Sequence, residues 1–334
     1  MDRPARHAPH LILAGSSQRM MHGLVLERSA PLFGRAREIM RIAPLPAGYI
    51  RQALRLRSDA AAVEAFAVWG GIPRYWELAA EFDTWQSAAE SLVLSPLGVL
   101  YDEPAALLLD DLRDTTQAAS ILALVGQGAH RLSEIAGRLG KPATALSRPL
   151  ERLVDLGLIM RETPFGVPGR NSKRSAYKIR DPFLRFWFRF VDPNRSRLES
   201  RQIAQTLAAV EAGFVHHAAG VWEDLVRESV ARAPYFDRGW GPAHRWWGAG
   251  LDRCPLKVDV LAQSMDGKAI LVGEVKWSSD VAPDRLRAEL EAKALQLPMV
   301  AGRKVEVGVW TKERPRGAPK RGVFGPREVL AALV

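Results

Sequence analysis

The stretch Leu256–Trp277 reads LKVDVLAQSMDGKAILVGEVKW, and it decides the fold of the C-terminal region. Two short apolar runs rich in β-branched residues flank an Asp-Gly turn signal, which predicts two adjacent antiparallel strands. Asp259 interrupts the first run. Glu274 and Lys276 interrupt the second, and their spacing of two places both on one face of the strand. We therefore expect two carboxylates and an ammonium to meet within otherwise apolar sequence.

Buried charges are costly unless they are paired or bind a metal ion. Asp259 and Glu274 are therefore candidate ligands of Mg²⁺, for which Mn²⁺ could substitute, with substrate phosphate filling the remaining coordination positions. Lys276 could orient the attacking water or stabilise the developing negative charge. The alternative is a solvated hairpin with an incidental salt bridge.

An acidic helix precedes this hairpin. Residues 214–228 read FVHHAAGVWEDLVRE, a plausible amphipathic helix that carries Glu223. A helix with an acid, then Asp on a strand, then Glu-x-Lys on the next strand resembles the PD-(D/E)XK order of the restriction-endonuclease-like superfamily. This resemblance implies a nuclease-like α/β domain with a helix at 282–295 and a further strand at 304–310. It also implies a catalytic set of Glu223, Asp259, Glu274 and Lys276, with Glu223 completing the metal shell.

Composition bounds the class of protein. The chain has 334 residues, 47% of them hydrophobic and 25% charged, which suits two or three globular domains. No apolar run approaches the ~20 residues that cross a bilayer, and no signal-peptide pattern follows Met1. The single cysteine, Cys254, excludes an internal disulfide and a cysteine-cluster zinc site. We expect a cytoplasmic protein with no membrane partner.

The positive charge is concentrated locally. The formal net charge is +10, and residues 121–200 hold 15 Lys/Arg against 7 Asp/Glu, an excess of 8. A local basic excess favours a surface that faces nucleic acid over general solubility.

Residues 115–180 carry the clearest local pattern. Three helical segments are expected at 118–125, 131–140 and 143–156, followed by strands that open at 157–159 and at 176–179. Three helices and a two-stranded wing predict a winged helix, a variant of helix-turn-helix.

If this unit binds DNA, its third helix enters the major groove and its wing contacts phosphate. The candidate residues on the helix are Thr144, Ser147, Arg148 and Arg152, and those on the wing are Arg170, Lys173 and Arg174. The alternative is a protein-interaction spacer with a solvated basic loop.

Two further patterns concern the core. Phe183, Trp187 and Phe190 fall on one side at helical spacing, which predicts core packing in preference to a base-stacking platform. His216 and His217 are adjacent on a helix and point in different directions, so we do not expect them to bind one metal together.

Several motifs resemble the archaeal-type P-loop ATPases, an AAA-like family. They are the apolar run at 11–17 ending in Gly-Ser-Ser, the Phe-Gly-Arg at 33–35, the Gly-Gly-Ile-Pro at 70–73, the Trp pair at 246–247 and the GEVKW at 273–277. The resemblance implies that residues 11–17 form the late, sensor-bearing strand of a nucleotide domain, with Ser16 and Ser17 at the sensor position. It also implies that Arg35 lies at the family's Gly-Arg and that residues 46–114 form the helical lid.

The sequence departs from that family in one respect. A P-loop needs Gly-x₄-Gly-Lys-Ser/Thr so that backbone amides surround the phosphates, and the chain contains no such stretch. We therefore expect a shortened member, or one whose true start lies upstream, that binds ATP only if a missing N-terminal half is supplied.

The sequence thus predicts an α/β multidomain chain. The expected parts are a remnant of the ATPase core (1–45), a helical lid (46–114), a winged helix (115–180), a connector (181–213) and a PD-(D/E)XK nuclease-like domain (214–334). The leading function is that of a Mg²⁺-dependent, nuclease-like protein that interacts with DNA. The alternatives are a non-catalytic DNA- or protein-binding regulator, or the C-terminal part of a regulatory ATPase whose other half is a separate polypeptide.

Overall fold

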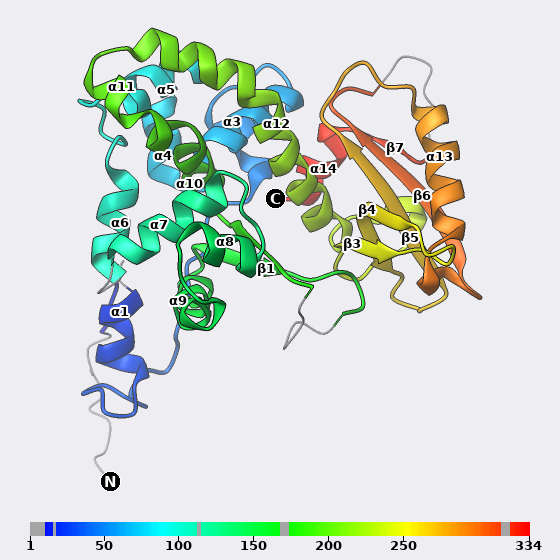
Figure 1. The fold of residues 1–334 in the computed structure, drawn as a ribbon, viewed down its shortest axis with the longest axis horizontal. Coiled ribbons are helices and arrows are strands. Elements are labelled where there is room, and N and C mark those ends of the chain that lie inside the picture. The colour runs from blue at the N-terminus through cyan, green and yellow to red at the C-terminus, as the bar shows by residue number, and fades with distance from the viewer. Residues whose placement is uncertain (1–10, 16–17, 112–114, 168–173, 315–320) are drawn as a thin grey trace, which may run out of the picture.

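The computed structural model describes residues 11–15, 18–111, 115–167, 174–314 and 321–334. It is a mixed α/β structure in which a helical half lies beside a five-stranded sheet (Figure 1). The helices of the first third are α1 (Gln18–Met21), α2 (Ile50–Ala53), α3 (Asp59–Trp69), α4 (Pro73–Ala79), α5 (Trp85–Ala89) and α6 (Glu103–Asp111).

The middle of the chain forms the helices and the hairpin expected from its sequence. These elements are α7 (Thr115–Gly126), α8 (Leu132–Arg138), α9 (Ala143–Asp155), β1 (Ile159–Glu162) and β2 (Ala176–Ile179). β1 and β2 pair antiparallel, with Ile159 opposite Ile179. Apolar side chains at i, i+4 and i+7 of α9, namely Leu146, Leu150 and Leu153, are buried, so the opposite face of this helix is left to solvent.

The predicted hairpin at 256–276 is confirmed. β4 (Pro255–Gln263) and β5 (Ala269–Lys276) pair antiparallel, with Val260 opposite Gly273. The sheet order is β3-β4-β5-β6-β7, where β3 (His244–Ala249) is antiparallel to β4, and β6 (Lys304–Thr311) and β7 (Val323–Phe324) run parallel to β5. The helix and strand expected after the hairpin are also confirmed, as α13 (Pro283–Leu295) and β6.

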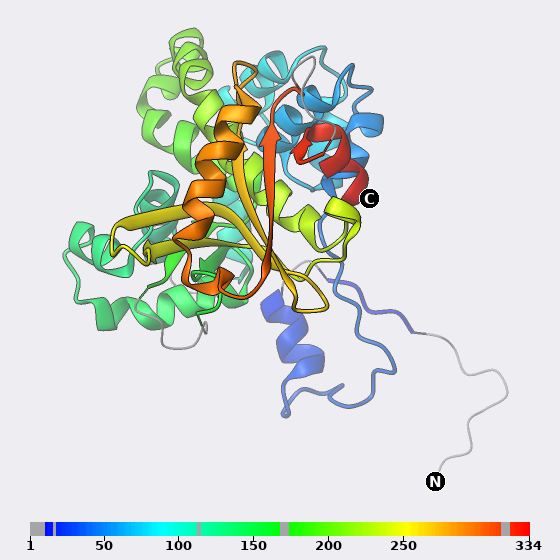
Figure 2. The same cartoon turned by 90° about the vertical axis from the view of Figure 1, so that its right-hand side faces the viewer.

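Helices cover both faces of the sheet because successive strand residues alternate between two apolar cores. Ile270 and Val272 pack with Leu290 of α13 on one face, which Figure 2 shows in front of the sheet. Leu271 and Val275 face the larger core, to which α12 (Ile203–Val230) and the C-terminal α14 (Pro326–Ala332) also contribute.

The helix α12 joins the two halves of the molecule. The sequence suggested a connector and a separate acidic helix that meet near residue 213, but the structure has one continuous 28-residue helix, so this division falls inside it. Gly213 lies inside this helix, and a Cβ atom there would lie 2.9 Å from the ring of Phe190. The glycine therefore allows close packing of α12 on the segment that precedes it.

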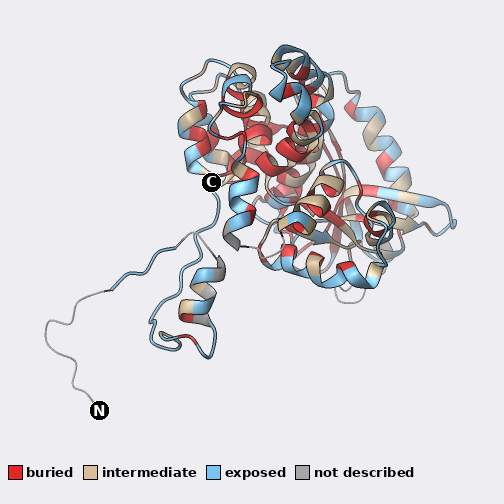
Figure 3. Cartoon of the chain, turned by 60° about the vertical axis from the view of Figure 1, so that its left-hand side comes forward, coloured by how far each residue is buried: buried red, intermediate tan, exposed pale blue. Residues whose placement is uncertain are grey.

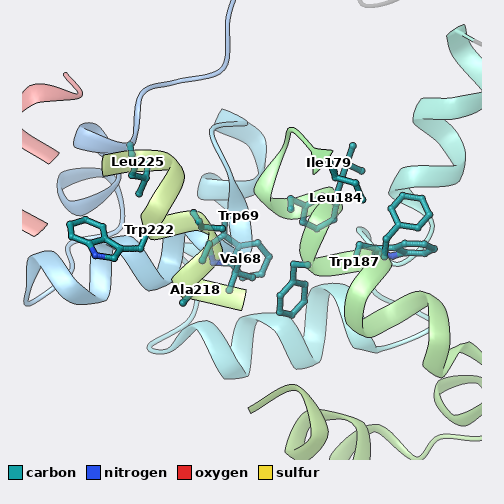
Figure 4. Close-up of a cluster of buried hydrophobic side chains, with 14 of the residues drawn as sticks. Val68, Trp69, Ile179, Leu184, Trp187, Ala218, Trp222 and Leu225 are labelled. Carbon is teal, nitrogen blue, oxygen red and sulfur yellow. The ribbon is translucent and has the colours of Figure 1, made fainter. Parts of the chain in front are cut away.

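That preceding segment is core, as predicted. Phe183, Trp187 and Phe190 lie in α10 (Pro182–Phe186) and the π-helical turn after it, and all three are buried. The buried side chains cluster where these residues meet α3 and α12, as the interior colouring of Figure 3 and the close-up of Figure 4 show. The short α11 (Arg195–Glu199) leads into α12. No helix in the described ranges is long and apolar enough to cross a bilayer.

The strand predicted at residues 11–17 is wrong for the residues that the structure describes. Residues 11–15 have no regular structure, and the side chains of Leu11 and Ile12 are 78% and 89% exposed. A strand needs a neighbour to satisfy its backbone groups, and no strand in the described part of the chain pairs with this segment. Ser16 and Ser17 lie outside the described residues, and Arg35 is the exposed last residue of a turn.

A charged cluster fixes α12 against the hairpin and α10. The Asp224 carboxylate contacts three cations, Lys178 Nζ of β2 at 2.6 Å, Arg185 Nη2 of α10 at 2.9 Å and Arg227 Nη2 at 2.5 Å. Although burial opposes ionisation, the Lys178, Arg185 and Arg227 cations hold the pKa of Asp224 well below its usual range. We call these four residues the Asp224 cluster.

The stability of the protein should fall on mild acidification because of His217. Its Nε2 donates to the Ala67 carbonyl at 2.7 Å, and burial lowers the pKa of His217 to about 3. The unfolded chain binds a proton below about pH 6.5 and the folded chain does not, so the free energy of unfolding should decrease as pH falls below that value, by up to about 1.4 kcal/mol per pH unit.

Urea unfolding between pH 7.5 and 5.5 checks this. His217→Gln keeps a donor and removes the titration, so the difference in stability between wild type and variant should shrink as pH falls. The comparison is needed because the pKa of Asp181 is raised to about 6 by burial, which makes that residue contribute in the opposite sense. A pH-independent difference would contradict the assignment.

Removing the Asp224 carboxylate should be severely destabilising. Asp224→Ala leaves Lys178, Arg185 and Arg227 without their shared anion, and because a quarter of the Asp224 side chain stays exposed we expect a loss of about 3 kcal/mol. Glu228→Ala, which breaks the exposed pair with Arg232, should cost under about 1 kcal/mol. The denaturant midpoints of the two variants measure the difference in stability. Equal losses of stability would show that the Asp224 cluster stabilises the protein no more than an exposed ion pair does.

Candidate functional site

The charged residues singled out from the sequence lie on three elements that meet at the edge of the two cores. Glu223 is on α12, Asp259 on β4, and Glu274 and Lys276 on β5. Their side chains are partly exposed, and the charges of Glu223, Glu274 and Lys276 all act on Asp259. The structure therefore brings these four residues together.

Asp259 is held against β5 through the backbone. Its Oδ2 accepts a hydrogen bond from the Val275 amide at 3.1 Å, the residue between Glu274 and Lys276. Burial raises the pKa of Asp259, the Glu223 and Glu274 carboxylates raise it further, and the result is about 6. The carboxyl group thus lies in a negative local field that a cation would relieve.

Glu274 is the most enclosed of the four. Its side chain is 13% exposed, and each of its carboxylate oxygens has an ammonium partner. Lys276 Nζ lies 2.7 Å from Oε1, and Lys293 Nζ of α13 lies 3.3 Å from Oε2. Although partial burial opposes the charge, the Glu274 carboxylate raises the pKa of Lys276. Lys293 was not anticipated from the sequence.

Arginines surround Glu223. Arg227 Nη1 lies 3.4 Å from Glu223 Oε2 and also donates to the Asp259 carbonyl oxygen at 3.1 Å. Arg245 Nε of β3 lies 3.9 Å from the same Glu223 oxygen. Arg227 therefore joins the site to the Asp224 cluster. The sequence indicated the contact between Arg227 and Glu223 only through their spacing of four residues on one helix.

The hairpin β1-β2 also reaches the site. Glu162 at the end of β1 lies 3.9 Å from Arg227 Nη2 and 3.8 Å from Arg245 Nη1. The Phe165 amide donates to the Arg245 carbonyl at 2.9 Å, and the Phe165 side chain packs on the smaller core. Glu162 is thus a fourth carboxylate near the site, brought there by packing that the sequence alone does not specify.

The chemistry of the set suits a hard cation. Asp259 and Glu274 supply carboxylate oxygens, which Mg²⁺ prefers, and Mg²⁺ is commonly held by one or two carboxylates with water and phosphate completing the shell. Among the described residues no group of three or more His, Cys, Asp and Glu side chains is arranged to hold a metal ion. An ion here would therefore depend on these two carboxylates and on a rearranged or solvent-completed shell.

The two histidines of α12 behave as the sequence suggested. His217 is buried against Phe186 and Phe190, whereas His216 is exposed, so the two point in different directions. Trp246 is buried in the smaller core beside the site.

The candidate DNA-binding residues fall into two groups. Those on α9, namely Thr144, Ser147, Arg148 and Arg152, are all exposed on the face opposite the buried leucines. Of those on the wing, Arg170 and Lys173 lie outside the described residues. Arg174 is exposed and donates to the Trp247 carbonyl of β3, so it contacts the protein itself.

Comparison with known proteins gives a family match over part of the chain. Residues 187–292, which include Glu223, Asp259, Glu274 and Lys276, match the family DUF234, described as archaea bacterial proteins of unknown function. An uncharacterized protein of Methanocaldococcus jannaschii is 27% identical over 270 residues, which is 80% of this chain and 59% of that protein. No solved structure matches the chain significantly. The chain is therefore similar to a family without an assigned activity, and it spans little more than half the length of this relative.

Proposed function

We propose that this chain is a Mg²⁺-dependent phosphodiesterase that acts on DNA. The observation that carries the proposal is the convergence of Glu223, Asp259, Glu274 and Lys276 at one point. In this proposal the sheet with α12 and α13 is a restriction-endonuclease-like domain, and α7 to α9 with β1-β2 form a winged helix.

The chain's own residues have distinct roles in the proposed reaction. Asp259 and Glu274 would hold Mg²⁺ or Mn²⁺, which when bound supplies positive charge to the phosphate and acidifies a bound water. The Val275 amide keeps the Asp259 carboxylate in place. Lys276 orients the attacking water or stabilises the charge that develops on the phosphate. Glu223 completes the metal shell if Arg227 and Arg245 release it.

DNA is the proposed partner because of the exposed polar face of α9. Arg148 and Arg152 lie on this face beside Thr144 and Ser147, in the segment with the local excess of positive charge. Exposed arginines on a helix suit contacts to base edges and phosphates in a major groove.

A non-catalytic regulator is the second candidate, and one observation favours it. Glu223 and Glu274 already have cationic side-chain partners, so neither needs a metal ion for neutralisation. In that case the site is a structural ion cluster and α9 binds DNA or a protein. A role as the C-terminal part of a regulatory ATPase, with ATP bound by a separate half, stays a proposal that draws on the sequence resemblance alone.

Metal-dependent cleavage of DNA tests the first proposal. Wild type should cut plasmid, linear or branched DNA with Mg²⁺ or Mn²⁺, and EDTA should abolish cutting. Asp259→Asn, Glu274→Gln and Lys276→Ala should each lower the cleavage rate by at least about 100-fold, because each removes a metal ligand or the charge at the reacting phosphate.

The matched control is Glu289→Gln, an exposed acid on α13 that pairs with Arg285 of the same helix. It should cut at the wild-type rate. If folded wild type binds DNA but cuts none of these substrates with either metal, the second candidate replaces the first.

Salt dependence of DNA binding tests the role of α9. Arg148→Ala and Arg152→Ala should each weaken binding and reduce the slope of log affinity against log salt by about 0.9 if each contacts one phosphate. Arg74→Ala removes a similarly exposed arginine from α4, far along the chain in the helical half, and should leave the slope unchanged. Fluorescence anisotropy with labelled duplex gives the slopes, and equal slopes for all four proteins would rule out α9 as the DNA contact.

A further inference from the structure

The Glu274 carboxylate has two ammonium partners, one on each oxygen. Lys276 Nζ lies 2.7 Å from Oε1, and Lys293 Nζ lies 3.3 Å from Oε2. Both lysine side chains are more than a third exposed, 44% and 37%, whereas Glu274 is 13% exposed. Two partly exposed ammonium groups therefore flank the more enclosed Glu274 carboxylate.

The position of Lys293 follows from how α13 packs. Leu290 and Ala294 are buried in the smaller core, which turns the intervening Lys293 towards β5. Other cations of α13, Arg285 and Arg287, pair with glutamates one turn further along their own helix. Lys293 instead reaches across to the sheet, on the face where Glu274 and Lys276 also lie.

A metal ion would compete with one lysine for Glu274. A divalent cation that binds Glu274 through Oε2 would lie beside the Lys293 ammonium, and the repulsion between the two positive charges would weaken that contact. Lys276 has the shorter contact and lies on the same strand as Glu274. Lys293 has the longer contact and is therefore the lysine that a metal ion displaces more easily.

We propose that Lys293 is a second lysine of the site, and that it binds a backbone phosphate of DNA when a metal ion takes its place at Glu274. The inference rests on the proposed function. Lys293 makes an ionic contact to a non-bridging phosphate oxygen and transfers no proton. The arrival of the phosphate gives the displaced ammonium a new anionic partner, so metal and DNA should each strengthen the binding of the other.

Lys293→Met tests the contact, since it keeps the length of the side chain and removes the charge. We expect the cleavage rate to fall at least about tenfold, and the slope of log DNA affinity against log salt, measured in Ca²⁺, to decrease by about 0.9 for one lost phosphate contact. Lys293→Arg should restore most of the slope. Arg285→Met, which removes a cation from the exposed face of the same helix, should leave both quantities at their wild-type values.

The outcomes are separable. Loss of cleavage with an unchanged salt slope would mean that Lys293 only positions Glu274, which overturns the proposal and leaves the proposed function standing. Unchanged cleavage and slope in folded Lys293→Met would overturn it as well. If Lys293→Met fails to fold, Lys293→Ala replaces it. The proposal then requires a reduced salt slope and cleavage rate in Lys293→Ala and a largely restored slope in Lys293→Arg, and an unchanged slope in Lys293→Ala overturns it. No cleavage by folded wild type would remove the proposed function, and this inference with it.

Discussion

The ionic contacts of Asp224 are the constraint on which the arrangement of the molecule depends. One carboxylate contacts cations from β2, α10 and its own helix, and Arg227 extends the set to Glu223 and to the Asp259 carbonyl. Because each member would be costly to leave unpaired in a poorly solvated place, the cluster is stable only when all the elements are together. The contacts of Asp224 set the orientation of α12. They therefore also set the position of Glu223, which precedes Asp224 on this helix.

Further contacts connect the β1-β2 hairpin to the sheet. Glu162 reaches Arg227 and Arg245, and the Phe165 amide bonds to β3, which is the outer strand of the sheet at that side. Since α9 packs on β1, its exposed face is held in a fixed relation to the carboxylates of β4 and β5. The helical half therefore helps to position the residues of the site.

The sequence was informative where local chemistry decides the structure. The Asp-Gly turn and the alternating runs predicted β4 and β5, and the order of acids predicted which residues would meet. It was misleading at residues 11–15, whose apolar pattern suits a strand although no strand among the described residues pairs with them, and at the expected division near residue 213, which falls inside one continuous helix. Lys293, Arg245 and Glu162 could not be found in advance, because only the packing of α13, β3 and the hairpin brings them to the site.

The distribution of charge distinguishes the three central acids. Glu223 has two arginines and Glu274 has two lysines, whereas the close hydrogen bond of the Asp259 carboxylate comes from the neutral Val275 amide. Its raised pKa reflects burial and this imbalance. Added positive charge beside Asp259 would therefore oppose the effect of the Glu223 and Glu274 carboxylates on it. On the proposed mechanism, an ion beside Asp259 would add positive charge at the acid whose pKa is raised, and it would release the Lys293 ammonium, so the cation that pairs with Glu274 in this structure would bind the phosphate of the substrate.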